Sequence, residues 1–217
     1  DDVVCHGMGS ADGIDYVGQT AWSPFAFSTG WTFTDEETWG RRFNYDDERF
    51  IATIDWYFGL VDKGFFPPYG KFGESSPKQA QLQAGSSALA LDGSWMISTY
   101  ANMEGIDLGI ASLPSGPIGH PMSMFNGLGD SISEQSEKKE EAARLIAFLA
   151  SDEAQRVIGE RAPFFPATDA GTEAAIDSFA DEGLDVTPFT DRVANGETAL
   201  YPLVENSASI MSIMQTA

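Results

Sequence analysis

The residues Asp92-Gly93-Ser94-Trp95 place an indole directly after an acidic residue and a glycine turn. They follow the apolar run 88–91, so the tryptophan stands at the mouth of a predicted strand rather than inside it. A flat aromatic ring removes the apolar face of a ligand from water, and adjacent polar side chains fix the ligand's orientation. Asp92, Ser94 and Trp95 are therefore candidates for a ligand-binding site. The structural alternative is that Trp95 is a core residue at a strand end.

Other aromatic residues have similar neighbours. Phe125-Asn126-Gly127 again joins an aromatic ring to a polar residue and a glycine, and Trp22 and Trp31 lie in a densely aromatic segment. Sugars have apolar C–H faces and hydroxyl edges, so they fit an aromatic plate with a polar rim. The pattern indicates a carbohydrate-binding surface that includes Phe125 and Asn126, with Trp22 as a weaker candidate.

The sequence gives little support for metal or nucleophilic chemistry. Its two histidines, His6 and His120, lie far apart and with the single Cys5 give no metal-ligand spacing. There is no G-x-S-x-G elbow and no Walker-type motif, and the glycines at 7, 9 and 13 are one residue off the dinucleotide fingerprint. We therefore predict no catalytic residue, no metal ion and no cofactor.

A carboxylate pair is the remaining catalytic alternative. A glycosidase needs two carboxylates about 5 to 10 Å apart across the sugar. With 33 acidic residues, some pair will meet that spacing by chance. A carbohydrate-active hydrolase therefore stays a minority hypothesis beside a binding protein.

Composition excludes several partner classes. The 217 residues include 33 acidic and 12 basic side chains, a formal net charge of −21. Nucleic acids and anionic membrane surfaces are bound by clustered Lys and Arg, so both are disfavoured. No apolar run approaches the roughly 18 residues of a membrane-spanning helix. Cys5 lacks a partner for an internal disulfide and lacks the small-residue context of a lipidated cysteine.

Strands and helices alternate along the chain, which indicates the α/β class. Apolar residues at helical spacing predict a helix within 44–64, with acidic residues at its start and Gly64 after its end. A second amphipathic helix is predicted around 142–149, and Ser151 marks the start of another. Further helices are expected at 172–180, after Thr187-Pro188, and at the C-terminal end. The predicted strands are 2–7, 88–92, 105–114 and 127–133.

The order of three segments resembles the extracellular solute-binding proteins of ABC importers, family 1, the sugar-binding and maltose-binding-protein-like group. The segments are "QAGSSALALDGSWMISTY", "GIDLGIASLPSGPIGHPMSMFNGLGDSIS" and "SEQSEKKEEAARLIAFLASDEAQRVIGERAPFFPAT". The resemblance implies a periplasmic-binding-protein type II-like fold with a mixed sheet flanked by helices in each lobe. It also implies that two lobes close on the ligand by hinge bending.

Carried onto this sequence, the resemblance makes Trp95 the aromatic platform on the cleft wall, with Asp92 and Ser94 beside it. Phe125 and Asn126 would present groups from the opposite lobe, and Trp22 matches an aromatic-bearing helix start. The interlobe crossings would be 108–112 and 163–166. A further aromatic is usual near residues 205 and 206, and Tyr201 is the nearest one here.

The sequence departs from the family at both ends. The first part of the N-terminal lobe has no counterpart, and the chain stops before the family's last helix, so we expect a fragment. Residues 1–111 and 163–217 are assigned to the C-terminal lobe and 112–162 to an excursion belonging to the N-terminal lobe. The excursion would lack its sheet partners, leaving the apolar stripe 142–149 exposed or packed on a neighbour.

The function that the resemblance implies is capture of a carbohydrate outside the membrane and its delivery to ABC permease subunits. The full-length protein would be extracellular, as a cell-surface lipoprotein or in the periplasm, and would touch the membrane only through an anchor absent from this chain. The alternatives are the hydrolase and the same fold binding a peptide, an amino acid derivative or a polyol.

Overall fold

The computed structural model describes residues 4–7, 19–35, 37, 41–68, 71, 77–162, 164–202 and 204–216. The strands are β1 (Val4–Gly7), β2 (Ser87–Ala90), β3 (Ser123–Phe125) and β4 (Thr198–Leu200). The helices are α1 (Gln19–Phe27), α2 (Glu48–Asp62), α3 (Lys78–Gln83), α4 (Ile97–Ala101), α5 (Lys139–Leu149), α6 (Asp152–Arg161), α7 (Asp169–Asp181), α8 (Thr187–Ala194) and α9 (Ser207–Thr216), and a 3-10 turn, η1 (Ser94–Met96), precedes α4. Gly9, Gly13 and Pro163, which the sequence singled out, lie outside these ranges.

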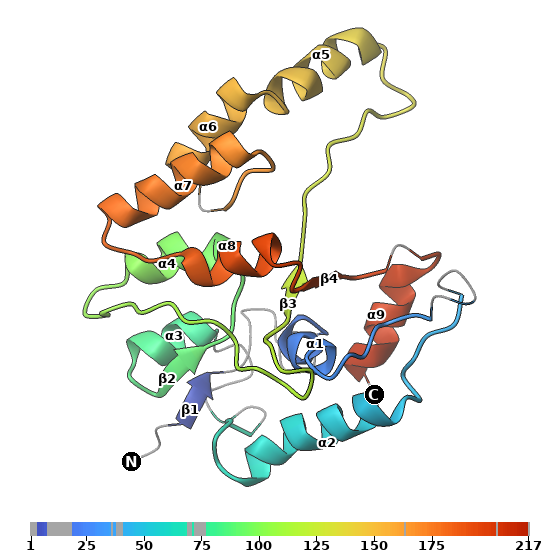
Figure 1. The fold of residues 1–217 in the computed structure, drawn as a ribbon, viewed down its shortest axis with the longest axis vertical. Helices are drawn as coiled ribbons and strands as arrows, with labels where there is room; N and C mark the ends of the chain where they lie inside the picture. The colour runs from blue at the N-terminus through green and yellow to red at the C-terminus, as the bar shows by residue number, and fades with distance from the viewer. Residues whose placement is uncertain are drawn as a thin grey trace.

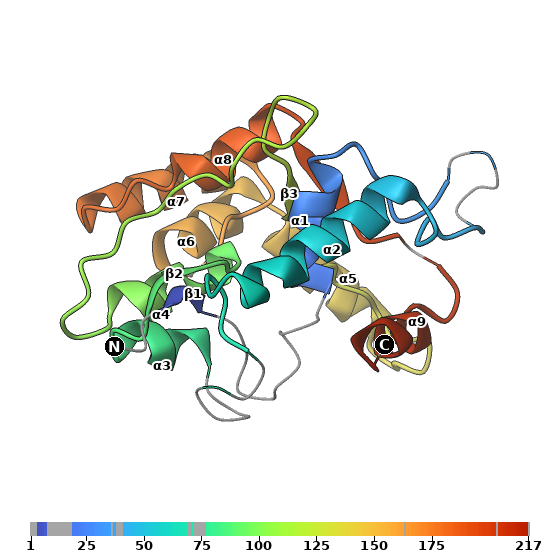
Figure 2. The same cartoon turned by 90° about the horizontal axis from the view of Figure 1, so that it is seen from below.

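An aromatic core lies between α1 and α2. Trp31 is at its centre, with ring centroids 4.8 Å from Phe33 and 5.0 Å from Phe50, and its indole nitrogen donates to the carbonyl of Asn44 at 2.8 Å. Both views place α1 between α2 and the β3–β4 segment (Figures 1 and 2). Side chains before and within β3, from β4 and from α9 cover this core.

The predicted helix 44–64 is confirmed as α2, and its ends follow from local chemistry. Asp47 stands at the N-cap, where its carboxylate accepts from the backbone N–H of Arg49 at 2.8 Å. Carboxylates are favoured there because the first N–H groups of a helix have no partner within it. The chain leaves the helix through Gly64, whose φ of 76° suits a residue without a Cβ.

The strands form two parallel pairs among the described residues. β1 pairs with β2, and β3 pairs with β4. The strands predicted at 105–114 and 127–133 are not formed, which corrects the sequence prediction. A strand needs a neighbour for its backbone groups, and neither segment runs beside another strand within the described part of the chain.

A second core joins α4, α7 and α8. Ile97, Phe179 and Val186 are buried there, and Phe165 and Phe189 pack against them. α6 lies tightly along α7, because Gly159 and Gly171 have no side chains at the crossing. A Cβ on Gly159 would overlap the backbone carbonyl of Gly171.

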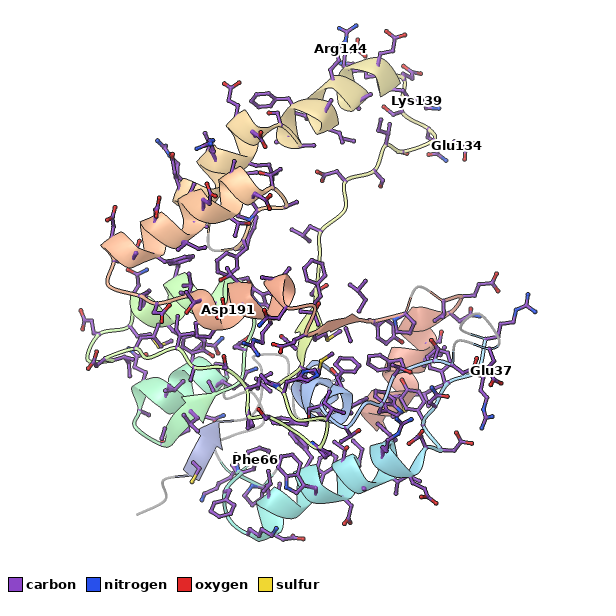
Figure 3. All side chains as sticks on the ribbon, viewed as in Figure 1. Glu37, Phe66, Glu134, Lys139, Arg144 and Asp191 are labelled. Carbon is purple, nitrogen blue, oxygen red and sulfur yellow. The ribbon has the colours of Figure 1, made fainter. Side chains whose placement is uncertain are left out.

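Helices α5, α6 and α7 form an arm that extends from the rest of the molecule (Figure 1). An extended segment leads from β3 to its far end, where Glu134, Lys139 and Arg144 point outward (Figure 3). Apolar side chains are exposed both on this segment, where Leu128 is 93% exposed, and on α5, where Leu145 is 57% exposed. Of the apolar stripe predicted at 142–149, Leu145 is exposed and Ala142, Ile146 and Leu149 are half-buried. Among the described helices, none is both long and apolar enough to cross a membrane.

Candidate ligand-binding site

Trp95 projects from η1, which follows β2 after a link of three residues. The turn closes when the backbone N–H of Met96 donates to the carbonyl of Gly93 at 3.0 Å. The six-membered edge of the indole lies over Gly93, since a Cβ there would overlap ring atoms Cη2, Cζ3 and Cζ2. The side chain is nevertheless 45% exposed. Trp95 is therefore held on the backbone at one edge while much of its surface stays open to solvent.

Asp92 is the centre of a polar cluster next to η1. Its Oδ1 accepts from the backbone N–H of Gly93 at 2.9 Å, and its Oδ2 accepts from the hydroxyl of Tyr100 at 2.8 Å. Lys78 Nζ lies 3.5 Å from the same Oδ2, and the Lys78 and Asp92 side chains are only 11% and 15% exposed. The carboxylate is therefore occupied by protein groups on both oxygens and has its charge paired.

Helix α3 also contacts the chain on either side of Trp95 in sequence. Lys78 Nζ also donates to the carbonyl of Leu91 at 2.9 Å, and Gln79 Nε2 donates to the sulfur of Met96 at 3.9 Å. Consecutive residues of one helix thus hold the chain before and after Trp95. The sequence did not predict these contacts, because Lys78, Gln79 and Tyr100 belong to no motif and meet Asp92 and Met96 only through the fold.

The other predicted residues lie on two segments. Ser94 is half-buried at the start of η1. Phe125 and Asn126 are exposed at the end of β3, beside α1, and the Phe125 ring folds back toward Gly127, with Cε1 at 3.4 Å from an ideal Cβ there. They therefore remain candidates on a segment distinct from η1.

Trp22 does not suit a ligand contact. It is 2% exposed, and its ring centroid lies 5.2 Å from that of Phe50 and 5.9 Å from that of Trp31. The ring is enclosed because position 22 falls on the face of α1 that packs against α2. We therefore remove Trp22 from the site. Tyr201 also packs on the core, 5.0 Å from Phe33.

His120 lies in a second polar group, at the β3–β4 pair. Its Nδ1 is 3.2 Å from the carbonyl oxygen of Pro121 and 3.8 Å from a carboxylate oxygen of Glu197. Glu197 also forms an ion pair with Arg192 of α8. Because the backbone carbonyl of Glu197 accepts from the N–H of Ser123 at 2.9 Å, this group links α8 to the strand pair.

Comparison with known proteins shows the family to which the chain belongs. The profile of a family described as bacterial extracellular solute-binding protein matches residues 6–182. The chain belongs to this family. A search of curated protein sequences finds no match. Membership implies an extracellular or periplasmic location, and the family consists of binding proteins rather than enzymes.

Solved structures confirm the fold. The chain is similar to the GacH receptor of Streptomyces glaucescens (TM-score 0.76, 19% identity), to MalE3 of T. maritima (0.74, 18%) and to UspC of M. tuberculosis (0.71, 22%). The matches cover 98 to 99% of this chain but only 51 to 54% of those chains. The α/β, periplasmic-binding-protein-like class is thereby confirmed, and the chain spans about half the length of the structures it matches.

Proposed function

We propose that this chain is part of the solute-binding component of an ABC importer, and that the solute is a carbohydrate gripped between two lobes. The observation that carries the proposal is Trp95, an indole fixed on Gly93 with nearly half its surface open. Such a plate suits the apolar face of a pyranose, and Ser94 supplies an adjacent hydroxyl. Two structures of the same fold support the ligand class, since GacH was solved with acarbose and MalE3 with maltose.

In this proposal the two lobes come from different parts of a longer protein. Residues 1–111 and 163–217 are assigned to one lobe and 112–162 to an excursion into the other, with β3 at the start of the excursion still paired to β4 of the first lobe. The exposed apolar side chains of α5 and of the segment before it support this division, because an apolar surface of this kind is normally covered in a folded protein. The contact between Gly159 and Gly171 joins the end of the excursion to the helix after it.

Closure of the lobes provides the mechanism. A closed form is selected when both walls contact the ligand, so binding energy is converted into a change of shape without covalent chemistry. Phe125 and Asn126 would act from the excursion and Trp95 from the other wall. The closed form would deliver the sugar to the permease subunits from outside the membrane, with the protein held as a lipoprotein or free in the periplasm.

Ligand identification tests the proposal directly. The full-length protein that contains this chain would be purified and its bound ligand identified by native mass spectrometry. Calorimetric titration would then compare maltose, maltotriose and acarbose with a tripeptide and with sorbitol. We expect saturable heat from the oligosaccharides alone. Binding of the tripeptide or sorbitol with no response to any oligosaccharide would refute the carbohydrate assignment, and turnover of a labelled glycoside would favour the hydrolase.

A further inference from the structure

We propose that Lys78 and Tyr100 act through Asp92 to position Trp95, so that Asp92 organises the platform rather than contacting the ligand. This inference rests on the proposed function, because a platform needs something to bind. The evidence for the positioning is independent of any ligand. It consists of the contacts that converge on the five residues from Leu91 to Trp95.

The first step is the occupancy of the Asp92 carboxylate. Both oxygens already accept from protein donors, Oδ1 from the N–H of Gly93 and Oδ2 from the hydroxyl of Tyr100, and Lys78 Nζ lies 3.5 Å from Oδ2. The side chain is only 15% exposed. A ligand hydroxyl would have to compete with these donors for a carboxylate that faces the interior.

The second step is the path from Asp92 to the indole. The hydrogen bond from the N–H of Gly93 to Asp92 Oδ1 fixes the peptide on which the Trp95 ring rests. Lys78 Nζ donates to the carbonyl of Leu91, the residue before Asp92, at 2.9 Å. The backbone beneath the ring is therefore tied to α3 through Lys78 and to α4 through Tyr100.

The third step is the role of Gly93 as the seat of the ring. Its φ of −85° and ψ of 161° are open to any residue, so the backbone conformation does not require glycine. The requirement comes from the indole, which occupies the space of a Cβ. Glycine at this position is explained by close approach of the ring.

Positioning of this kind affects affinity because a rigid platform loses less conformational freedom when a ligand binds. Removing the Tyr100 hydroxyl leaves one oxygen of Asp92 with fewer donors and frees the link before η1. We expect the indole to sample other orientations in the ligand-free protein. Affinity then falls although no ligand contact has been deleted.

The test uses fluorine NMR of the full-length protein labelled with 5-fluorotryptophan, and Trp95→Phe assigns the Trp95 resonance. The variants are Tyr100→Phe, Lys78→Met and Gly93→Ala, each measured without ligand and then titrated with maltotriose. Tyr45→Phe is the matched control, because it removes a buried hydroxyl in the aromatic core around Trp31. Thermal unfolding identifies any variant that loses its fold.

We expect the three variants to shift or broaden the Trp95 resonance and to weaken maltotriose binding. For Tyr100→Phe the loss should be about five- to tenfold, the effect of losing about one hydrogen bond. Tyr45→Phe should leave both unchanged. If Tyr100→Phe and Lys78→Met prove unfolded, Asp92→Asn replaces them, since it removes the charge that pairs with Lys78 while keeping the size of the side chain. Gly93→Ala tests only the contact between the ring and position 93.

Three results would overturn the inference. Weaker binding with an unmoved Trp95 resonance would mean that the cluster contacts the ligand directly. A moved resonance with unchanged affinity would mean that ring orientation is irrelevant to binding, and no change in either would mean that the cluster does not hold the ring. If the wild-type protein binds no oligosaccharide while the variants still move the resonance, the proposed function fails and the positioning stands.

Discussion

Replacing Trp95 by alanine should weaken carbohydrate binding about 10- to 100-fold. A tryptophan side chain presents up to roughly 250 Å², and 45% of it is exposed here. About 110 Å² is therefore available to a ligand. At about 25 cal/mol per Å², covering half to all of this area contributes roughly 1.4 to 2.8 kcal/mol. Each 1.4 kcal/mol is about tenfold in the dissociation constant.

Trp56 provides a matched control. It is 44% exposed, almost the same as Trp95, but it lies on α2 with its ring 5.3 Å from that of Phe25. If binding depends on the placement of the indole and not on exposed aromatic area in general, Trp56→Ala should change the affinity less than twofold. Trp95→Phe should fall between the wild type and Trp95→Ala, because a smaller ring covers less of the sugar.

The assay is calorimetric titration of the full-length protein with maltotriose, after thermal unfolding shows that each variant is folded. A dissociation constant for Trp95→Ala within twofold of the wild type would refute the platform assignment. Equal losses in Trp95→Ala and Trp56→Ala would refute its location, because they would show that exposed indoles contribute alike.

Three further predictions concern stability. Asp47→Ala removes the N-cap of α2 and the ion pair with Arg49, so it should lower the free energy of unfolding by about 1 to 2 kcal/mol at pH 7 in urea titrations. The hydrogen bonds from Arg49 lower the pKa of Asp47 to about 2, below the value of 3.8 expected when unfolded. The contribution of its charge is thus complete above pH 4 and is lost as the pH falls toward 2, and a pH-independent difference between wild type and variant would contradict this sign. Gly159→Ala should lower the free energy of unfolding by about 1 to 3 kcal/mol, because its Cβ meets the Gly171 carbonyl. Gly59→Ala within α2, where nothing lies within 4 Å of a Cβ, should raise it by about 0.5 to 1 kcal/mol. A change of the same sign in both variants would refute the packing argument. Leu145→Glu should leave the melting temperature of the 217-residue chain unchanged and lower that of the full-length protein by several degrees, and equal behaviour in both would contradict a covering lobe.

The helices and their ends were predictable because their causes are local. The spacing of apolar residues determined α2 and α5, and Ser151 marked the start of α6, where its hydroxyl accepts from the N–H of Ala154. Each of these signals acts within about one helical turn. The aromatic residue after Asp92-Gly93-Ser94 was likewise visible as a candidate, and the structure leaves it exposed.

The tertiary structure decided what the candidate residues do. Trp22 and Trp95 were both candidates from the sequence, yet Trp22 is enclosed where α1 packs on α2 and Trp95 is open on η1. The strands expected at 105–114 and 127–133 failed to form because a strand depends on a neighbour that its own residues do not supply.

The sequence by itself determined the class of the fold, the position of most helices and the presence of an indole after a glycine turn, since these depend on residues close together in the chain. Only the tertiary structure showed that Asp92 faces Lys78 and Tyr100 and that the ring rests on Gly93. The contacts that Lys78 of α3 and Tyr100 of α4 make with Asp92 depend on how the chain folds back on itself, and no local pattern encodes them.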